Sequence, residues 1–290
     1  MSIWTGAVLL PLLGAMLHPL LGWAIQRAAR AGVGMILLAG ISGILTAVVT
    51  LVYRQPDGPL ALKGLDYLAL ANGVAFFFGQ WFSILSVRNG NLGVHSSVLG
   101  VKLLVVAALS VGMGLESGSP TLLIATLLAT IAVFLVAGAS WSGLRQHRHT
   151  VLLTLVACLF FGVNDYLTGQ FGASIGTSRW MALMFGSSGL LSVFLVLSRR
   201  RQARELARSR TALGFVLLAG LCLGVQAVLV NVAFSEFRQP ALSNVAYSSR
   251  GVMAVVALFL LGGAKGREQW RRKLAGSLLM VLALGLAVSD

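Results

Sequence analysis

Ten long apolar segments follow one another along this chain, separated by short polar stretches. A helix that crosses a bilayer needs about 20 mainly apolar residues, whereas the strands of a membrane barrel are shorter and alternate in polarity. Charged residues make up only 10% of the chain, so lipid must be the solvent for most of it. The sequence therefore predicts an all-α integral membrane protein with ten transmembrane helices, at residues 3–25, 33–53, 66–87, 91–113, 121–140, 151–171, 179–198, 211–234, 240–261 and 273–289.

The basic residues indicate how these helices cross the membrane. The chain has 22 Lys and Arg residues against 8 Asp and Glu, in short groups such as Arg199–Arg201 between the apolar segments. The odd-numbered loops hold 16 of the basic residues and the even-numbered loops hold 4. Because cytoplasmic loops are enriched in Lys and Arg, we expect the odd-numbered loops in the cytoplasm and both termini outside the inner or plasma membrane. The expected partner of this charge is anionic membrane lipid, and no nucleic-acid partner is expected.

An internal repeat divides the chain into two halves, residues 1–148 and 149–290. Each half would contain five helices, an odd number, so the second half must enter the membrane in the opposite orientation. Inverted repeats around a site near the membrane midplane are a recurring plan of secondary transporters. The glycines of the first match are expected to let helices pack closely. Matching positions recur in the same order at spacings of 146 to 151 residues: Gly40–Leu45 with Gly186–Leu191, Gln80 with Gln226, Lys102 with Arg250, and Ala125–Leu128 with Gly276–Leu279.

The fourth and fifth predicted helices carry a family resemblance. Asn91–His95 through Gly114–Glu116, together with ten helices arranged as five plus five, resemble the drug/metabolite transporter superfamily in its EamA-like branch. The corresponding turn of the second half is Gly263–Lys265. The resemblance covers nearly the whole chain and implies a ten-helix carrier of a small metabolite, without naming the solute.

Two cations lie near the middle of predicted helices, Lys102 in the fourth and Arg250 in the ninth. A charge at this depth costs about 2.5–3.5 kcal/mol on insertion scales, so each side chain is expected to face a cavity or a partner. Helical spacing places His95 on the face of Lys102 and Tyr247 on the face of Arg250. These residues predict a central site that binds a carboxylate or phosphate of the solute. The alternative is a permanent ion pair between one cation and Asp165, the only acid well inside a predicted helix.

For the other polar residues in the predicted helices, the sequence leaves open both a binding role and a structural role. Asp165 and His18 are candidates for the group that couples transport to protons, and His18 is otherwise a satisfied structural group. Asn72, Gln80 and Gln226 either hydrogen-bond the solute or bond neighbouring helices to one another.

Enzyme chemistry has no support in the sequence. The chain contains no paired carboxylates, no phosphate-binding Gly-Lys-Ser/Thr motif and no His/Cys metal-ligand spacing. Cys158 and Cys222 lie in apolar segments and are expected to act as small apolar side chains. We therefore expect no catalytic residue, cofactor or metal. The predicted function is a secondary transporter that carries a small anionic or zwitterionic metabolite by alternating access. The alternative is a flippase-like protein in which the same cations move an anionic lipid headgroup between leaflets.

Overall fold

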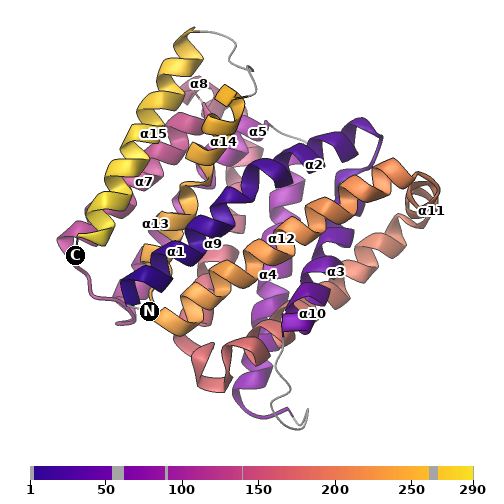
Figure 1. The fold of residues 1–290 in the computed structure, drawn as a ribbon, viewed down its shortest axis with the longest axis horizontal. Coiled ribbons are helices and arrows are strands. Elements are labelled where there is room, and N and C mark those ends of the chain that lie inside the picture. The colour runs from indigo at the N-terminus through magenta and orange to yellow at the C-terminus, as the bar shows by residue number, and fades with distance from the viewer. Residues whose placement is uncertain (1–2, 54–61, 89–90, 139, 261–266, 290) are drawn as a thin grey trace.

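The computed structural model describes residues 3–53, 62–88, 91–138, 140–260 and 267–289. Helices make up nearly all of these residues, and no strand occurs among them. Figure 1 shows one bundle of long helices, with both chain termini toward its lower left and the short helices α8 and α11 away from them, at the top and the right. The all-α class predicted from the apolar segments is confirmed.

Every predicted apolar segment is helical over most of its described residues. The helices that precede residue 148 are α1 (Ile3–Met16), α2 (His18–Arg30), α3 (Met35–Tyr53), α4 (Leu65–Arg88), α5 (Leu92–Val98), α6 (Val101–Gly112), α7 (Pro120–Ala137) and α8 (Trp141–Gln146). They are followed by α9 (Arg148–Phe171), the 3-10 helix η1 (Ala173–Ile175), α10 (Thr177–Ser198), α11 (Arg200–Arg208), α12 (Arg210–Phe237), α13 (Pro240–Ser248), α14 (Arg250–Leu260) and α15 (Arg267–Val288).

Eight helical segments of the described chain are long and apolar enough to cross a membrane. Large apolar side chains cover the outside of the bundle, and Leu190, Phe194 and Leu278 are 67%, 63% and 71% exposed, as suits contact with lipid. The structure therefore defines an all-helical, multi-pass membrane fold. The eight segments are Gly6–Arg30, Met35–Tyr53, Leu65–Val87, Leu92–Gly112, Pro120–Ala137, Arg148–Phe171, Thr177–Ser198 and Arg210–Phe237.

Three of the predicted helices are interrupted within their length. The first breaks directly before His18–Pro19, as expected of proline, which has no N–H for the helical hydrogen bonds. The fourth breaks at Leu99–Gly100 and the ninth at Ser249, where some backbone hydrogen bonds span three residues instead of four. Lys102 is the second residue of α6 and Arg250 is the first residue of α14, so each intramembrane cation directly follows a break.

The close packing between α3 and α10 depends on glycine. A Cβ on Gly43 would lie 2.3 Å from Ser192 Oγ, and Cβ atoms on Gly40 and Gly189 would be crowded in the same way by the partner helix. The expected packing role is confirmed for these three glycines. A Cβ on Gly186 would meet nothing within 4 Å, so the expectation does not hold there.

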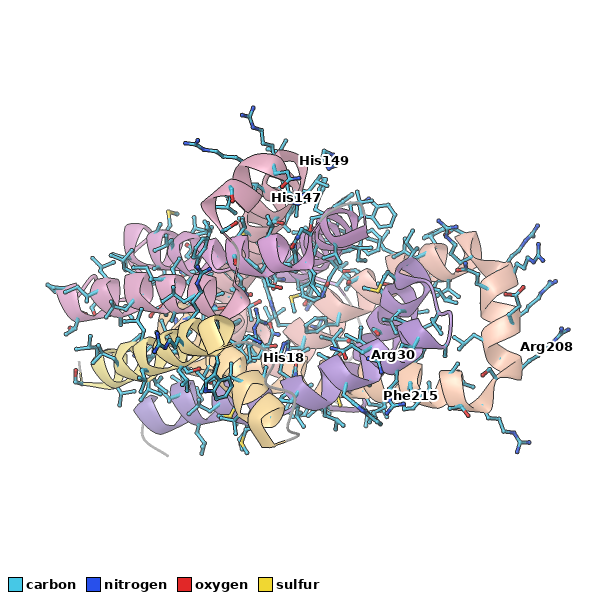
Figure 2. The ribbon with its side chains drawn as sticks, turned by 90° about the horizontal axis from the view of Figure 1, so that it is seen from above. His18, Arg30, His147, His149, Arg208 and Phe215 are labelled. Atoms are coloured by element: carbon cyan, nitrogen blue, oxygen red, sulfur yellow. The ribbon has the colours of Figure 1, made fainter. Side chains whose placement is uncertain are left out.

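The other long helices also pack in pairs around the centre of the bundle. α7 packs against α15, α4 against α9, and α12 against α1, α2 and α3. Figure 2 shows His18 inside the bundle, whereas His147, His149 and Arg208 lie at its periphery. α6 packs against both α9 and α13, and the breaks in α5–α6 and α13–α14 lie close to each other.

Candidate solute-binding site

A cavity of about 200 Å³ lies where the breaks of α5–α6 and α13–α14 meet the long helices α4, α9 and α12. Three residues predicted for the site, Asn72, His95 and His18, do not line this cavity. The structure thus brings together residues from segments that are up to 204 positions apart, from Thr46 to Arg250. Six of the predicted site residues line the cavity: Lys102, Arg250, Gln80, Gln226, Tyr247 and Asp165.

Lys102 and Asp165 form an ion pair in the wall of this cavity. Lys102 Nζ lies 2.6 Å from Asp165 Oδ2, and it is also 5.8 Å from the centre of the Phe161 ring. Asn244 of α13 donates from Nδ2 to the same Asp165 oxygen at 2.8 Å. Because Asp165 is only 5% exposed, its carboxylate needs these partners, and the pair ties α6, α9 and α13 together.

Arg250 has no such partner. Its guanidinium carbon lies 4.7 Å from the centre of the Tyr247 ring, and no carboxylate of the described residues lies within ion-pair distance of it. Asp66, at the start of α4, is engaged by Arg179, whose Nε and Nη2 donate to it at 2.9 and 2.7 Å. The cavity wall therefore carries one neutralised pair and one uncompensated positive charge.

α12 presents two amide side chains to the cavity. The Tyr247 hydroxyl donates to Gln226 Oε1 at 3.0 Å, and Asn231 Nδ2 donates to the backbone oxygen of Ala227 at 2.8 Å. Gln226 Nε2 and Asn231 Oδ1 are buried and have no hydrogen-bond partner in the described structure. Gln226 was predicted from the sequence and Asn231 was not, although both are polar residues within one apolar segment.

Asn72 bonds helices to one another, which was one of its two predicted roles. Its Nδ2 lies 3.2 Å from the backbone oxygen of Asn164 and 3.3 Å from Thr168 Oγ1, both on α9. The side chain is 1% exposed and lies beside Met184 of α10. It joins α4 to α9 and α10 outside the cavity.

His95 is held by three hydroxyl groups. Its Nδ1 lies 2.6 Å from Ser86 Oγ and 3.1 Å from Thr154 Oγ1, and its Nε2 lies 3.2 Å from Ser83 Oγ. Ser83 lines the cavity, so His95 stands one hydrogen bond behind the wall. This places His95 as a group that positions Ser83 and joins α5 to α4 and α9.

His18 begins α2, next to the break in the first predicted helix. Its Nδ1 is buried without a hydrogen-bond partner among the described residues. It is close enough to Arg250 for an electrostatic interaction, so it lies on the same side of the bundle as the unpaired cation. The structure therefore brings His18 near the site without making it part of the cavity wall.

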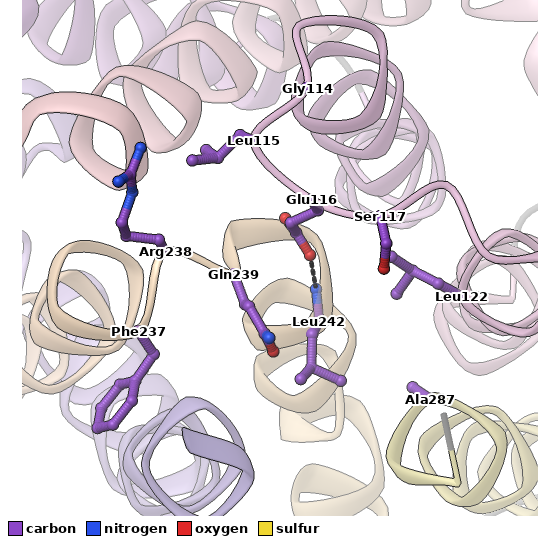
Figure 3. Close-up of a pocket in the computed structure, with 10 residues that line it drawn as sticks. All are labelled: Gly114, Leu115, Glu116, Ser117, Leu122, Phe237, Arg238, Gln239, Leu242 and Ala287. Carbon is purple, nitrogen blue, oxygen red and sulfur yellow. Dashed lines mark hydrogen bonds between the residues drawn. The ribbon is translucent and has the colours of Figure 1, made fainter.

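A second pocket, of about 400 Å³, opens where the α6–α7 connection meets the α12–α13 connection. Figure 3 shows Glu116 in this pocket, with its carboxylate directed at the first turn of α13. The backbone N–H groups of Ala241 and Leu242 donate to Glu116 at 2.6 and 3.4 Å. Burial raises the pKa of the Glu116 carboxyl to about 7, although these two N–H groups act to lower it. The pocket contains none of the predicted site residues, and we interpret Glu116 as the cap of α13.

The fold is shared with a known structure. No family model matches this chain, and no curated protein matches it. A crystal structure of another protein has a similar arrangement of helices, with a TM-score of 0.73 and 15% sequence identity over 98% of this chain and 96% of that chain. At this identity the similarity establishes the fold alone, and the fold and cavity together define an all-helical, multi-pass membrane protein with charged side chains in the wall of a central cavity.

Proposed function

We propose that this chain is a secondary transporter of a small anionic or zwitterionic metabolite, of the EamA-like branch of the drug/metabolite transporter superfamily. The observation that carries the proposal is Arg250, a cation without a carboxylate partner in the described structure that lines a cavity among membrane-crossing helices. Ionisable groups in such places mark solute and ion pathways. A guanidinium offers a planar set of donors that fits a carboxylate.

Ten transmembrane helices in two inverted halves, residues 1–148 and 149–290, belong to this proposal. The packing of the helices supports it. If the halves correspond, α3 matches α10 and α7 matches α15, and each of these helices packs against its own counterpart. The packing of α4 against α9 likewise matches that of α12 against α1 and α2. The breaks at Leu99–Gly100 and Ser249 fall at corresponding places in the two halves.

Alternating access would then open the cavity to one side of the membrane at a time, as one half moves against the other. The break before Arg250 leaves the start of α14 facing the cavity, and the positive end of a half-helix attracts an anion. Asp165 is the coupling candidate that lies in the cavity wall. A proton on Asp165 would remove its negative charge and free Lys102 from the ion pair. Proton binding and solute binding would therefore both change the net charge of the cavity.

The proposed orientation places the odd-numbered loops in the cytoplasm and both termini outside. The basic helix α11, Arg200–Arg208, supports it because it connects α10 and α12 at one end of the bundle. Both termini lie at the other end (Figure 1). Basic segments are retained on the cytoplasmic face beside anionic lipid.

The test is thermal unfolding of the purified protein with a panel of small carboxylates, phosphates, cations and phospholipids. A ligand of the native state at about one hundred times its Kd stabilises it by about 2.7 kcal/mol. We expect carboxylates to stabilise the wild type and Arg208→Gln, a control on exposed α11, but not Arg250→Gln. Equal stabilisation of Arg250→Gln, or stabilisation by cations alone, would contradict the proposal. Stabilisation by anionic phospholipid alone would favour the flippase-like alternative.

A further inference from the structure

We propose that α12 supplies the uncharged half of the solute site. In this arrangement Gln226 Nε2 donates to the carboxylate that Arg250 binds, and Asn231 Oδ1 accepts from a hydroxyl or amino group of the same solute. The solute class is therefore a small monocarboxylate with a hydrogen-bond donor beside an apolar body. This inference rests on the proposed transport function and names the solute chemistry for the same cavity.

Gln226 is the first observation. Its side chain is 1% exposed and lines the cavity, and its oxygen already accepts from the Tyr247 hydroxyl at 3.0 Å. The amide nitrogen that remains has no partner in the described part of the chain. Buried polar groups in native proteins are almost always hydrogen-bonded, so a free donor in a cavity wall indicates a ligand that accepts.

Asn231 is the second observation, and it has the opposite hydrogen-bonding sense. Its nitrogen donates to the backbone oxygen of Ala227 at 2.8 Å, and this contact fixes the amide orientation because a carbonyl oxygen only accepts. Asn231 Oδ1 is then left as a buried acceptor without a partner, in a side chain that is 6% exposed. A solute group that donates a hydrogen bond would satisfy it.

The charges of the cavity limit the solute to one negative group. Lys102 and Asp165 neutralise each other at 2.6 Å, so Arg250 alone determines the balance. A monocarboxylate would leave the cavity neutral, whereas a dianion such as a phosphate monoester would leave a buried negative charge without a partner.

Apart from the polar side chains of Thr46, Gln80, Ser83 and Asn164, the remaining wall is apolar and aromatic. Phe76 and Phe185 meet edge to face with their ring centres 5.1 Å apart, and Phe161 and Phe234 also line the cavity. Such a wall favours an apolar body on the solute through burial of its surface. Three matched probes test the separate features: 2-hydroxyisocaproate, isocaproate without the hydroxyl, and 2-hydroxyisocaproamide without the charge.

The experiment measures the affinity of the purified, full-length wild type for each probe by thermal shift and calorimetry. We expect 2-hydroxyisocaproate to bind about tenfold more tightly than isocaproate, as one hydrogen bond of about 1.4 kcal/mol predicts, and the amide not to bind. Asn231→Leu should remove the preference for the hydroxyl and leave isocaproate binding unchanged. Gln226→Leu should weaken both carboxylates about tenfold. Gln202→Leu, the same exchange at an exposed position of α11, should change nothing.

The outcomes separate this inference from the proposed function. If carboxylates bind in an Arg250-dependent way but the hydroxyl gives no advantage, or Asn231→Leu keeps that advantage, the assignment of α12 is wrong while the transport proposal stands. If Gln226→Leu binds both carboxylates like the wild type, its donor role is wrong. If no carboxylate binds the wild type, the proposed function fails together with the inference.

Discussion

The breaks in α5–α6 and α13–α14 differ in how the cation that follows each of them is neutralised. In α5–α6 and in α13–α14 a cation directly follows the break and lines the cavity. Lys102 forms an ion pair with Asp165, and Asn244 donates a hydrogen bond to the same carboxylate. Arg250 lies over the ring of Tyr247 and forms no ion pair with a carboxylate of the described residues. The cation at the first break is therefore neutralised within the protein, whereas the cation at the second break has no anionic partner in the described structure.

The difference indicates how one cavity divides structural and binding roles between two similar elements. A buried ion pair holds its helices in register, and loss of one partner leaves a costly charge. An unpaired cation costs stability when the cavity is empty, and that cost is offset when an anion binds. The following predictions test whether the two breaks differ in this way, beginning with the largest expected effect.

Asp165→Asn should disrupt the ion pair at the first break. It leaves Lys102 without its carboxylate, and loss of one partner from a buried pair costs about 3–5 kcal/mol. The variant should unfold at a clearly lower temperature in detergent. The double variant Lys102→Met with Asp165→Leu should recover most of the loss, because neither charge remains. An Asp165→Asn protein as stable as the wild type would show that the pair is not structural.

Glu116, which caps α13 ahead of the second break, should make the stability of the protein depend on pH. The folded chain raises the pKa of this carboxyl from 4.5 to about 7, so it binds the proton more tightly than the unfolded chain does. The contribution to stability is therefore greatest below pH 4.5 and is lost as the pH rises through about 7, by about 3 kcal/mol in total. Unfolding temperatures at about pH 5 and about pH 8 should differ less in Glu116→Gln than in the wild type. An unchanged difference would exclude Glu116 as the titrating group.

Arg250→Gln should affect binding and spare stability, in contrast to Asp165→Asn. Hydrogen bonds to a charged group contribute about 1.5–3 kcal/mol, so carboxylate affinity should fall roughly ten- to a hundredfold. The unfolding temperature without ligand should stay the same or rise, because an uncompensated charge is removed from the membrane. A large loss of stability would instead mean that Arg250 has a structural partner.

The glycines at the two breaks should differ by a smaller amount. A Cβ on Gly100 would lie 3.1 Å from Val133 and 3.2 Å from the backbone oxygen of Ser97, whereas one on Gly251 would lie an ordinary 3.4 Å from Val136. Gly100→Ala should destabilise by about 1 kcal/mol through crowding. Gly251→Ala should be neutral or stabilise by up to about 1 kcal/mol, since alanine favours helix. Equal effects in thermal unfolding would remove this distinction between the breaks.

Much of the fold could be predicted because hydropathy is local. Each apolar segment predicts its own helix, and the missing N–H of Pro19 explains the first interruption. The breaks at Leu99–Gly100 and Ser249 carried no such signal, because no proline stands there and the interruptions depend on neighbouring helices. Helical spacing likewise indicated which cations face inward, but it left open which of them Asp165 would meet.

The sequence by itself determined a chain of membrane helices and the positions of the few polar groups within them, because burial in lipid constrains every residue of a span. Only the tertiary structure decided that Asp165 pairs with Lys102, that His95 is held by hydroxyls behind the cavity wall, and that Asn231 and Gln226 line the same cavity as Arg250. The physical reason is that hydropathy is a property of each segment. The pairing of charges and hydrogen bonds is instead a property of the distances between segments, which packing alone determines.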